Sequence, residues 1–198
     1  ALNIREKTFG TKHNKITPTL NNLGKVLLEM GQWDQAMALF QRVLSIRQAT
    51  FGRDHPSLAT TLENIGEVFL AKGDFATAIP YLQQAVHLYG GPNAPSSAPA
   101  WHKIGLSYQR MGKYDEALHY HFDALPLVES LYGDQIFAAA IYNNIANCYM
   151  QKKVSSLALQ YFSIAAAALH QNFPQGHPDL AQMHNSMAIC YIRQGFLD

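Results

Sequence analysis

The sequence predicts an all-α fold in which antiparallel helix pairs stack into a solenoid, and three observations indicate this. First, a bulky apolar residue followed by Gly or Ala recurs at Leu23-Gly24, Ile65-Gly66, Ile104-Gly105, Ile145-Ala146 and Met187-Ala188. The steps between the second members are 42, 39, 41 and 42 residues, and a period of this size is typical of repeat proteins. Second, apolar residues around each pair are spaced i, i+3, i+4 and i+7, which is one face of a helix. Third, Gly31, Gly73, Gly112 and Gly195 stand where four of these helices should end.

The spacing of these residues resembles a known repeat family. Trp101, Ile104, Gly105 and Tyr108 follow the pattern W-x2-L-G-x2-Y, and Ala36 and Phe40 follow the pattern A-x3-F. Both patterns are similar to the tetratricopeptide repeat. The long period and a repeated loop motif resemble the kinesin-light-chain-like subtype; the motif occurs at 9–13, 51–56 and 173–178. The resemblance implies a right-handed α-solenoid, the superhelix of that family.

The repeat positions divide the chain into parts of one solenoid, 1–198. We expect a half repeat at 1–16, repeats at 17–58, 59–97, 98–138 and 139–180, and a second half repeat at 181–198. Neither half repeat has the polar outer face of a solenoid cap, so we expect a fragment of a longer array. The fourth repeat has Lys153 in place of the turn Gly and Ser155 in place of an aromatic residue. We therefore expect a looser or differently shaped turn there.

Composition excludes several classes of function. The net charge is +1, with 15% charged and 48% hydrophobic residues, so nothing points to nucleic acid, a membrane surface or disorder. The two cysteines, Cys148 and Cys190, exclude a disulfide scaffold and a four-thiolate zinc site. We expect both to be buried, inert thiols in a reducing compartment. No apolar run is long enough to span a bilayer. No catalytic motif is present, and we expect no enzyme activity, no metal and no cofactor; His55 and His177 recur with the repeat and should be structural.

The resemblance implies a concave groove lined by the first helix of each pair, and its positions give the candidate partner-binding residues. They are Asn21, Asn22, Lys25, Leu28, Asn64, Glu67, Leu70, His102, Lys103, Leu106, Gln109, Arg110, Asn143, Asn144, Asn147, Met150, Gln151, Asn185, Ile189 and Arg193. Asn is a poor residue inside a helix, whereas its amide suits the backbone of an extended peptide. The alternatives are that these amides only tie adjacent helices together and that the apolar members are ordinary, partly buried residues. Lys103, Arg110 and Arg193 indicate an acidic partner segment.

These residues predict a non-enzymatic scaffold or adaptor that binds a peptide segment of a partner protein. The resemblance implies cargo binding like that of kinesin light chains, by aromatic residues flanked by acids, in the cytoplasm and in association with the cytoskeleton. A carboxylate clamp of the chaperone-binding type fits less well, because Asn21 and Lys25 occur in the reversed order. Two alternatives stay open. One is a self-associating assembly module that uses uncapped ends, and the other is a sensor or regulatory domain of a larger protein.

Overall fold

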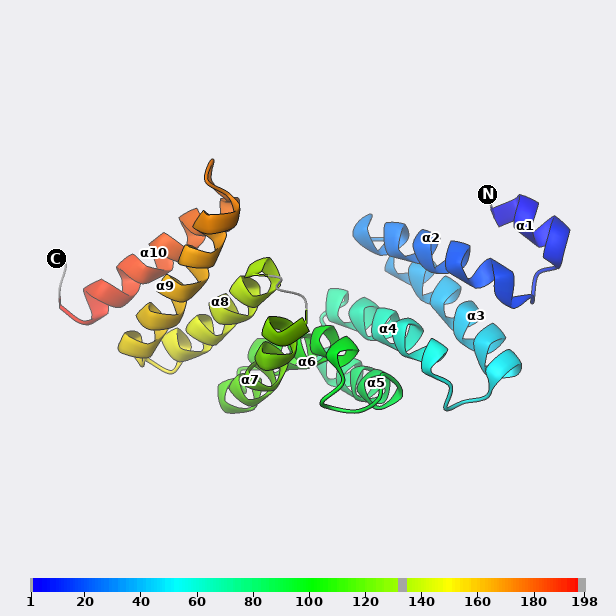
Figure 1. The fold of residues 1–198 in the computed structure, drawn as a ribbon, viewed down its shortest axis with the longest axis horizontal. Coiled ribbons are helices and arrows are strands. Elements are labelled where there is room, and N and C mark those ends of the chain that lie inside the picture. Colours follow the sequence, from blue (N-terminus) through cyan, green and yellow to red (C-terminus); the bar gives the residue numbers. More distant parts are fainter. Residues whose placement is uncertain (1, 132–134, 196–198) are drawn as a thin grey trace. The chain divides into compact units, whose positions relative to one another are not determined.

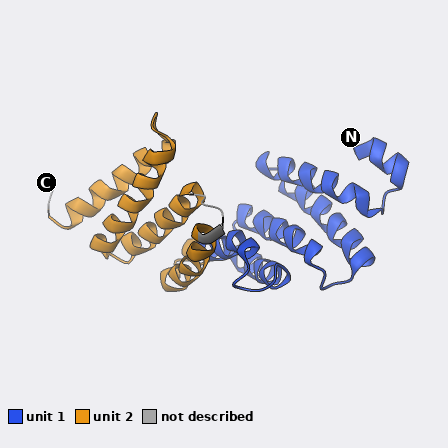
Figure 2. Cartoon of the chain, viewed as in Figure 1, with its two compact units in different colours: residues 1–107 blue, residues 108–198 orange. Residues whose placement is uncertain are grey.

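The computed structural model describes residues 2–131 and 135–195, and within these residues it contains helices and no strand. The all-α solenoid of helix pairs is confirmed (Figure 1). The chain forms two compact units, 1–107 and 108–198, with the division inside one helix (Figure 2). We describe each unit by itself. No helix in the described part of the chain is both long and apolar enough to cross a membrane.

Unit 1 consists of short and long helices in alternation. In chain order they are α1 (Leu2–Phe9), the 3-10 turn η1 (Asn14–Ile16), α2 (Thr17–Glu29), α3 (Trp33–Phe51), η2 (Pro56–Leu58), α4 (Ala59–Ala71), α5 (Phe75–Leu88), η3 (Pro95–Ser97) and most of α6 (Ala98–Arg110). The helices α2 and α3 pack together, as do α4 and α5, while α3 and α2 both contact α4. The first helices α2, α4 and α6 begin at Thr17, Ala59 and Ala98.

Unit 2 continues the same build with α7 (Tyr114–Leu131), α8 (Gln135–Gln151), α9 (Ser155–Asn172) and α10 (Pro178–Arg193). Here α8 contacts both α7 and α9, and α9 contacts α10. The first helices α8 and α10 begin at Gln135 and Pro178, a few residues before the expected limits of 139 and 181. Residues 196–198 of the last expected half repeat lie outside the described residues.

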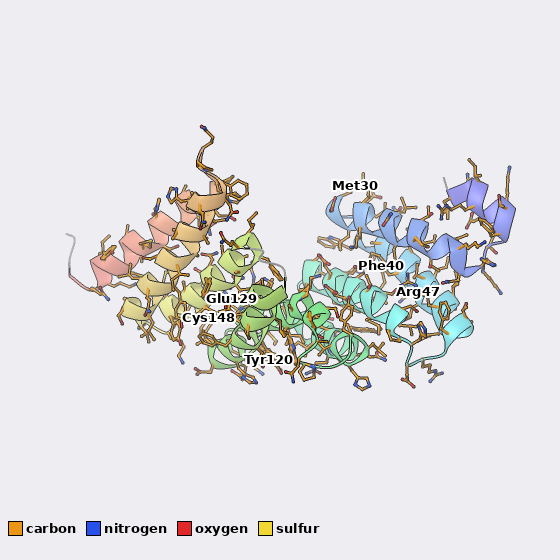
Figure 3. The ribbon with its side chains drawn as sticks, in the orientation of Figure 1. Met30, Phe40, Arg47, Tyr120, Glu129 and Cys148 are labelled. Carbon is orange, nitrogen blue, oxygen red and sulfur yellow. The ribbon has the colours of Figure 1, made fainter. Side chains whose placement is uncertain are left out.

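The small residue of each pair allows the two helices to approach closely. A Cβ added to Gly24 would lie 2.6 Å from the ring of Phe40, and one added to Gly66 would lie 2.8 Å from Leu82. Each glycine therefore sits where the large residue of the A-x3-F pattern from its own second helix fills the space. Figure 3 labels Phe40 on α3. The expected reason for the Leu-Gly and Ile-Gly pairs, close contact with the partner helix, is confirmed.

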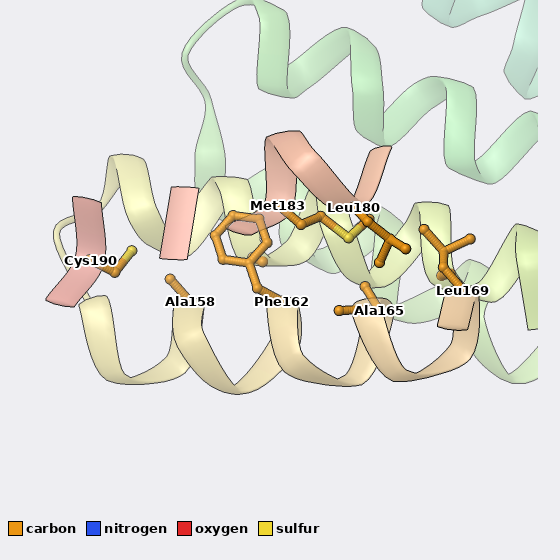
Figure 4. Packing of buried hydrophobic residues seen from close by; sticks show 10 residues of the cluster. Ala158, Phe162, Ala165, Leu169, Leu180, Met183 and Cys190 are labelled. Carbon is orange, nitrogen blue, oxygen red and sulfur yellow. The ribbon is translucent and has the colours of Figure 1, made fainter. Parts of the chain in front are cut away.

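The core of unit 2 joins α8, α9 and α10. Its buried members include Ala158, Phe162, Ala165 and Leu169 from α9 and Leu180, Met183 and Cys190 from α10 (Figure 4). Both cysteines are free and buried. Burial raises the pKa of the Cys148 thiol to about 12, against a smaller opposing effect of Lys152. Such a thiol stays protonated and unreactive at neutral pH, so the expected structural role of the cysteines is supported.

The repeated loop motif is a helix-starting turn. The Phe and His rings of the motif contact each other in all three copies, with centroids 5.6 Å apart for Phe9 and His13 and 4.5 Å apart for Phe51 and His55. Nδ1 of each histidine accepts the backbone N–H two residues later, at Lys15, Ser57 and Asp179. The imidazole thus takes the place of the usual Asn or Ser cap. His55 and His177 have the structural role that their recurrence predicted.

The fourth turn corrects the sequence expectation. Gly31 has φ 73° and Lys153 has φ 62°, so both residues adopt the left-handed conformation. Gly31 N–H donates to the carbonyl of Leu28, and Lys153 N–H donates in the same way to the carbonyl of Met150. The turn of the fourth repeat is therefore not looser or differently shaped. The carbonyls at the helix end require the same turn, and Lys153 adopts a backbone conformation that usually favours glycine.

The left-handed backbone conformation of Lys153 is unfavourable for a residue with a side chain. We therefore predict that Lys153→Gly stabilises the protein. A non-glycine residue in the left-handed region costs about 1 kcal/mol, so we expect urea denaturation to show a free energy of unfolding higher by roughly that amount. Gly112→Lys is the matched control, because Gly112 has φ 76° and open space around its Cβ position. It should lower stability by a similar amount. Equal stability of the parent and Lys153→Gly proteins would contradict the prediction.

Candidate functional site

The first helices of unit 1 place part of the candidate set on one surface. We call this surface the first-helix face of unit 1, and define it as the side chains of Asn22, Lys25, Leu28, Glu67, Leu70, Lys103 and Leu106. Asn22 and Lys25 are exposed, and the other five are half-buried. They belong to α2, α4 and α6, and α2 contacts α4 directly. Polar and apolar groups are therefore mixed along neighbouring helices.

Two of the predicted amides lie below this surface. Asn21 and Asn64 are buried. The side-chain Oδ1 of Asn21 and Nδ2 of Asn64 have no hydrogen-bond partner among the described residues. A buried polar atom without a partner costs about 1–3 kcal/mol and needs an explanation. A partner molecule reaches these two amides only if the side chains above them shift, whereas it can reach Asn22 directly.

An ion network that the sequence interpretation did not foresee crosses the face. The ammonium of Lys103 donates to Glu63 Oε1 and Glu67 Oε2, each at 2.8 Å. The hydroxyl of Tyr89, at the end of α5, donates to the other oxygen of Glu63 at 2.7 Å. Three helices are thus tied together by one buried carboxylate. Glu63 and Glu67 are four residues apart on α4, and this spacing beside a lysine one repeat later is the signal that could have revealed the network.

The network neutralises the positive charge that the sequence places at Lys103. Burial by itself lowers the pKa of Lys103, but the carboxylates of Glu63 and Glu67 outweigh it, so the pKa lies above its usual value. The ammonium stays charged at neutral pH and is already neutralised by two carboxylates. Lys103 was expected to bind an acidic residue of a partner, yet its charge is used inside the protein. The three charged groups together carry one net negative charge.

His102 lies beside this network on α6. Burial, helped by the charge of Lys103, lowers the pKa of its imidazole to about 4. His102 is therefore neutral at physiological pH and brings no positive charge to this part of α6.

Unit 2 presents the remaining candidates on α8, α10 and the last residues of α6. The side chains of Asn143, Asn144, Asn147 and Met150 are half-buried, as is Gln109, whereas Arg110, Gln151, Asn185, Ile189 and Arg193 are exposed. Nη1 of Arg193 donates to the carbonyl of Met150 at 3.1 Å, which ties α10 to α8. Arg193 keeps further donors, since a guanidinium carries five N–H groups. Amides and cations thus occur together in this unit, with no acid at the candidate positions.

Two hollows on the described surface lie apart from these candidates. A hollow of about 440 Å³ is lined by residues such as Glu129, Tyr142 and Ile164, and one of about 630 Å³ by residues such as Glu6 and Arg42. Neither hollow includes a candidate residue. Among the described residues, no group of three or more His, Cys, Asp or Glu side chains is arranged to hold a metal ion.

The network predicts that Lys103→Met destabilises the protein. Removing the ammonium leaves the carboxylate of Glu63 buried without its cation, and breaking a buried pair in this way is costly. Because the pair is partly solvated, we expect a loss of about 2 kcal/mol of unfolding free energy in urea denaturation. Adding Glu63→Gln should recover part of this loss. The control, Lys25→Met on the exposed part of the face, should change stability by less than about 0.5 kcal/mol; equal losses in both single variants would refute the role of the network.

The lowered pKa of His102 predicts acid sensitivity. The imidazole has a pKa near 4 in the folded protein and about 6.5 in the unfolded chain. Between these values the unfolded state binds more protons, so stability falls as the pH drops from 6.5 to 4. The contribution is at most about 3 kcal/mol. His102→Gln should lose less stability than the parent protein over this range in thermal unfolding, and parallel pH profiles would show the prediction to be wrong.

Comparisons with known proteins agree with the geometry. The sequence model of the tetratricopeptide repeat family matches residues 1–49, 15–90 and 96–162, which together make up more than half of the chain. No curated protein matches the chain significantly. Among solved structures, a Podosopora anserina protein named for kinesin light chain, with nearly identical TPR-like repeats, is 20% identical with a TM-score of 0.74. The match covers 92% of this chain and 88% of that one.

Two further structures share the fold. BtubC (BKLC) from P. vanneervenii is 19% identical with a TM-score of 0.78, and the match covers 92% of this chain and 74% of that one. MamA is 18% identical with a TM-score of 0.65, over 91% of this chain and 83% of that one. Identities this low show the fold alone. The family match and the helix pairs lead to the same conclusion: this chain belongs to the tetratricopeptide repeat family.

Proposed function

We propose that this protein binds an extended segment of a partner protein across the first helices of its repeats. The tetratricopeptide repeat fold implies a protein–protein interaction scaffold, and proteins of this fold are generally non-enzymatic. The observation that carries the finer proposal is the first-helix face of unit 1, whose side chains on α2, α4 and α6 are exposed or half-buried. The network around Lys103 ties α4 to α6, and a preformed surface loses little entropy on binding.

Apolar and amide side chains would make different kinds of contact with the partner. The half-buried Leu28, Leu70 and Leu106 offer contacts for aliphatic or aromatic anchors of the partner. The exposed Asn22 and the half-buried Asn144 each offer two donors and an acceptor to a peptide backbone. Asn21 and Asn64 are buried, so they are less accessible to a partner than Asn22 or Asn144.

Charge would set the preference of unit 2 for an acidic segment. Arg110 and Arg193 are exposed, while Lys103 of unit 1 is neutralised by its own carboxylates. Of the three cations that the sequence suggested, only these two arginines remain to bind acidic residues. A cargo-adaptor role in the cytoplasm, near the cytoskeleton, is part of the same proposal, and one structure of the same fold is named for kinesin light chain.

A peptide titration tests the proposal. The probe is a fluorescent peptide with one tryptophan flanked by Glu and Asp, and fluorescence anisotropy measures its binding at low and at physiological salt. We expect saturable binding that weakens as salt rises. Arg193→Glu should weaken it by about tenfold, which corresponds to one lost ion pair replaced by a repulsion. Asn144→Ala should weaken it independently of salt.

Two controls keep the outcome clear. Arg53→Glu makes the same charge change on the loop between α3 and η2 and should leave binding unaltered. The same peptide with Gln and Asn in place of its acids should bind less tightly. If the acidic peptide does not bind, or if Arg53→Glu weakens it as much as Arg193→Glu, the proposed binding site is wrong.

A further inference from the structure

Unit 2 has a hollow that is lined by the end of α7, the first half of α8, and α9. Its volume of about 440 Å³ lies in the range of about 300–1,000 Å³ that is usual for ligand sites. The apolar lining residues are Ala138, Ile164, Ala167 and Ala168. The polar lining residues are Glu129 near the end of α7 (Figure 3), Gln135, Tyr142 and Gln171. Such a site combines apolar contact area with a few polar groups, as ligand sites commonly do.

Unit 1 has a hollow at the equivalent repeat positions. The α3 residues that line it, which lie 18, 21, 22 and 25 residues after Gly24, are Arg42, Ser45, Ile46 and Ala49. The α9 residues of the hollow in unit 2, which lie the same numbers of residues after Ala146, are Ile164, Ala167, Ala168 and Gln171. Glu6 and Glu129 also correspond, because each stands three residues before an aromatic residue and a glycine in the sequence. The two hollows can therefore be compared position by position.

In unit 1 the protein supplies this site with an arginine of its own. Nη2 of Arg42 donates to Glu6 Oε1 at 2.6 Å and to the carbonyl of Thr11 at 2.6 Å. The side chain of Arg42 is 34% exposed and that of Glu6 is 21% exposed, so the ion pair is partly shielded from water. Hydrogen bonds between ionised groups are stronger than those between neutral groups. The hollow of unit 1 thus shows which group the equivalent positions accept, namely a guanidinium that reaches the carboxylate.

In unit 2 the same site keeps the carboxylate but lacks the arginine. The residue at the position of Arg42 is Ile164, which is 38% exposed and carries no charge. Oε1 of Glu129 accepts a hydrogen bond from the hydroxyl of Tyr142 at 2.5 Å, and no cation pairs with Glu129 among the described residues. Burial, helped by Glu129, raises the pKa of Tyr142 to about 12, so its hydroxyl is neutral at physiological pH. The hollow of unit 2 therefore carries a negative charge that the described residues leave without a counter-ion.

We propose that the hollow of unit 2 binds an arginine side chain of a partner protein, whose guanidinium pairs with Glu129 as Arg42 pairs with Glu6. The aliphatic part of that arginine lies against Ile164 and Ala168, because apolar carbons gain free energy when they leave water. The side-chain amide of Gln171 adds an acceptor. A guanidinium has five N–H donors in a planar fork, so it suits a carboxylate and an amide together better than the ammonium of a lysine does.

This site is separate from the one in the proposed function. None of the candidate partner-binding residues lines the hollow, and the favoured charge is the opposite one, because Arg110 and Arg193 favour acidic segments whereas Glu129 favours a basic residue. The two proposals can therefore fail independently. The protein binds a basic residue at the hollow whether or not an acidic segment binds at the first helices.

A peptide titration followed by NMR tests the proposal. The probe is a short alanine peptide with blocked ends and one central arginine, and its matched control carries citrulline, which has nearly the same shape but no charge. The backbone amide signals of Ile164 and Ala168 should shift saturably with the arginine peptide. We expect a Kd on the order of 1 mM, since a single side chain gains little binding energy. The citrulline peptide should bind about tenfold more weakly, and added salt should weaken only the arginine peptide.

Two variants of α7 locate the charge that binds. Glu129→Gln should weaken binding of the arginine peptide by about tenfold, while its amide oxygen can still accept the hydrogen bond of Tyr142. The matched control is Glu116→Gln, because Glu116 is an exposed acid in the first turn of the same helix. It should leave binding unchanged.

A variant of α9 gives an independent readout. Ile164→Arg places an arginine at the position that Arg42 has in unit 1, so it should occupy the hollow and abolish binding of the peptide. Ile164 is exposed, and circular dichroism checks that the variant folds. Saturable shifts that depend on Glu129 and disappear in Ile164→Arg support the proposal. It is overturned if the signals of Ile164 and Ala168 do not shift, if the citrulline peptide binds equally well, or if Glu129→Gln and Glu116→Gln have equal effects.

Discussion

The repeated fold depends on the close contact between the small residue of each first helix and a large residue of its second helix. At Gly24 and Gly66 no Cβ fits, because the ring of Phe40 and the side chain of Leu82 fill that space. The contact fixes how the two helices of a pair face each other. It also decides which sides of the first helix are left for other purposes, since a neighbouring second helix takes the adjacent apolar side, as α3 does at Ile65 and Val68.

Most of the fold could be predicted from the sequence, because it follows from local periodicity. The helix pairs, the close-contact glycines and the His-capped turns each depend on residues that recur one period apart. Lys153 shows why a local rule failed: its side chain is unusual for the turn, but the carbonyls at the end of α8 require that turn all the same. The hydrogen bonds of the helix end outweigh the strain of one residue.

The candidate site was less predictable, because its properties depend on pairs of residues from different repeats. The sequence places Lys103 at a surface position of α6, and only the structure shows that its ammonium lies between Glu63 and Glu67 of α4. The burial of Asn21 and Asn64 likewise depends on neighbouring helices and not on spacing within one helix. A repeat pattern predicts which side of a helix a residue occupies, but not which charges meet there.

The lysines of the array form ion pairs with acids on different helices. Lys72 and Lys152 pair with acids at the start of a neighbouring second helix, and Lys103 pairs with acids on a neighbouring first helix. In each case an ion pair ties one repeat to the next. The lysine charge is then neutralised within the protein and is less available to a partner molecule. At the position after α2 that is equivalent to Lys72 and Lys152, the residue is Met30, which cannot form an ion pair. The residue type at a repeated position therefore decides whether an ion pair can tie that repeat to its neighbour.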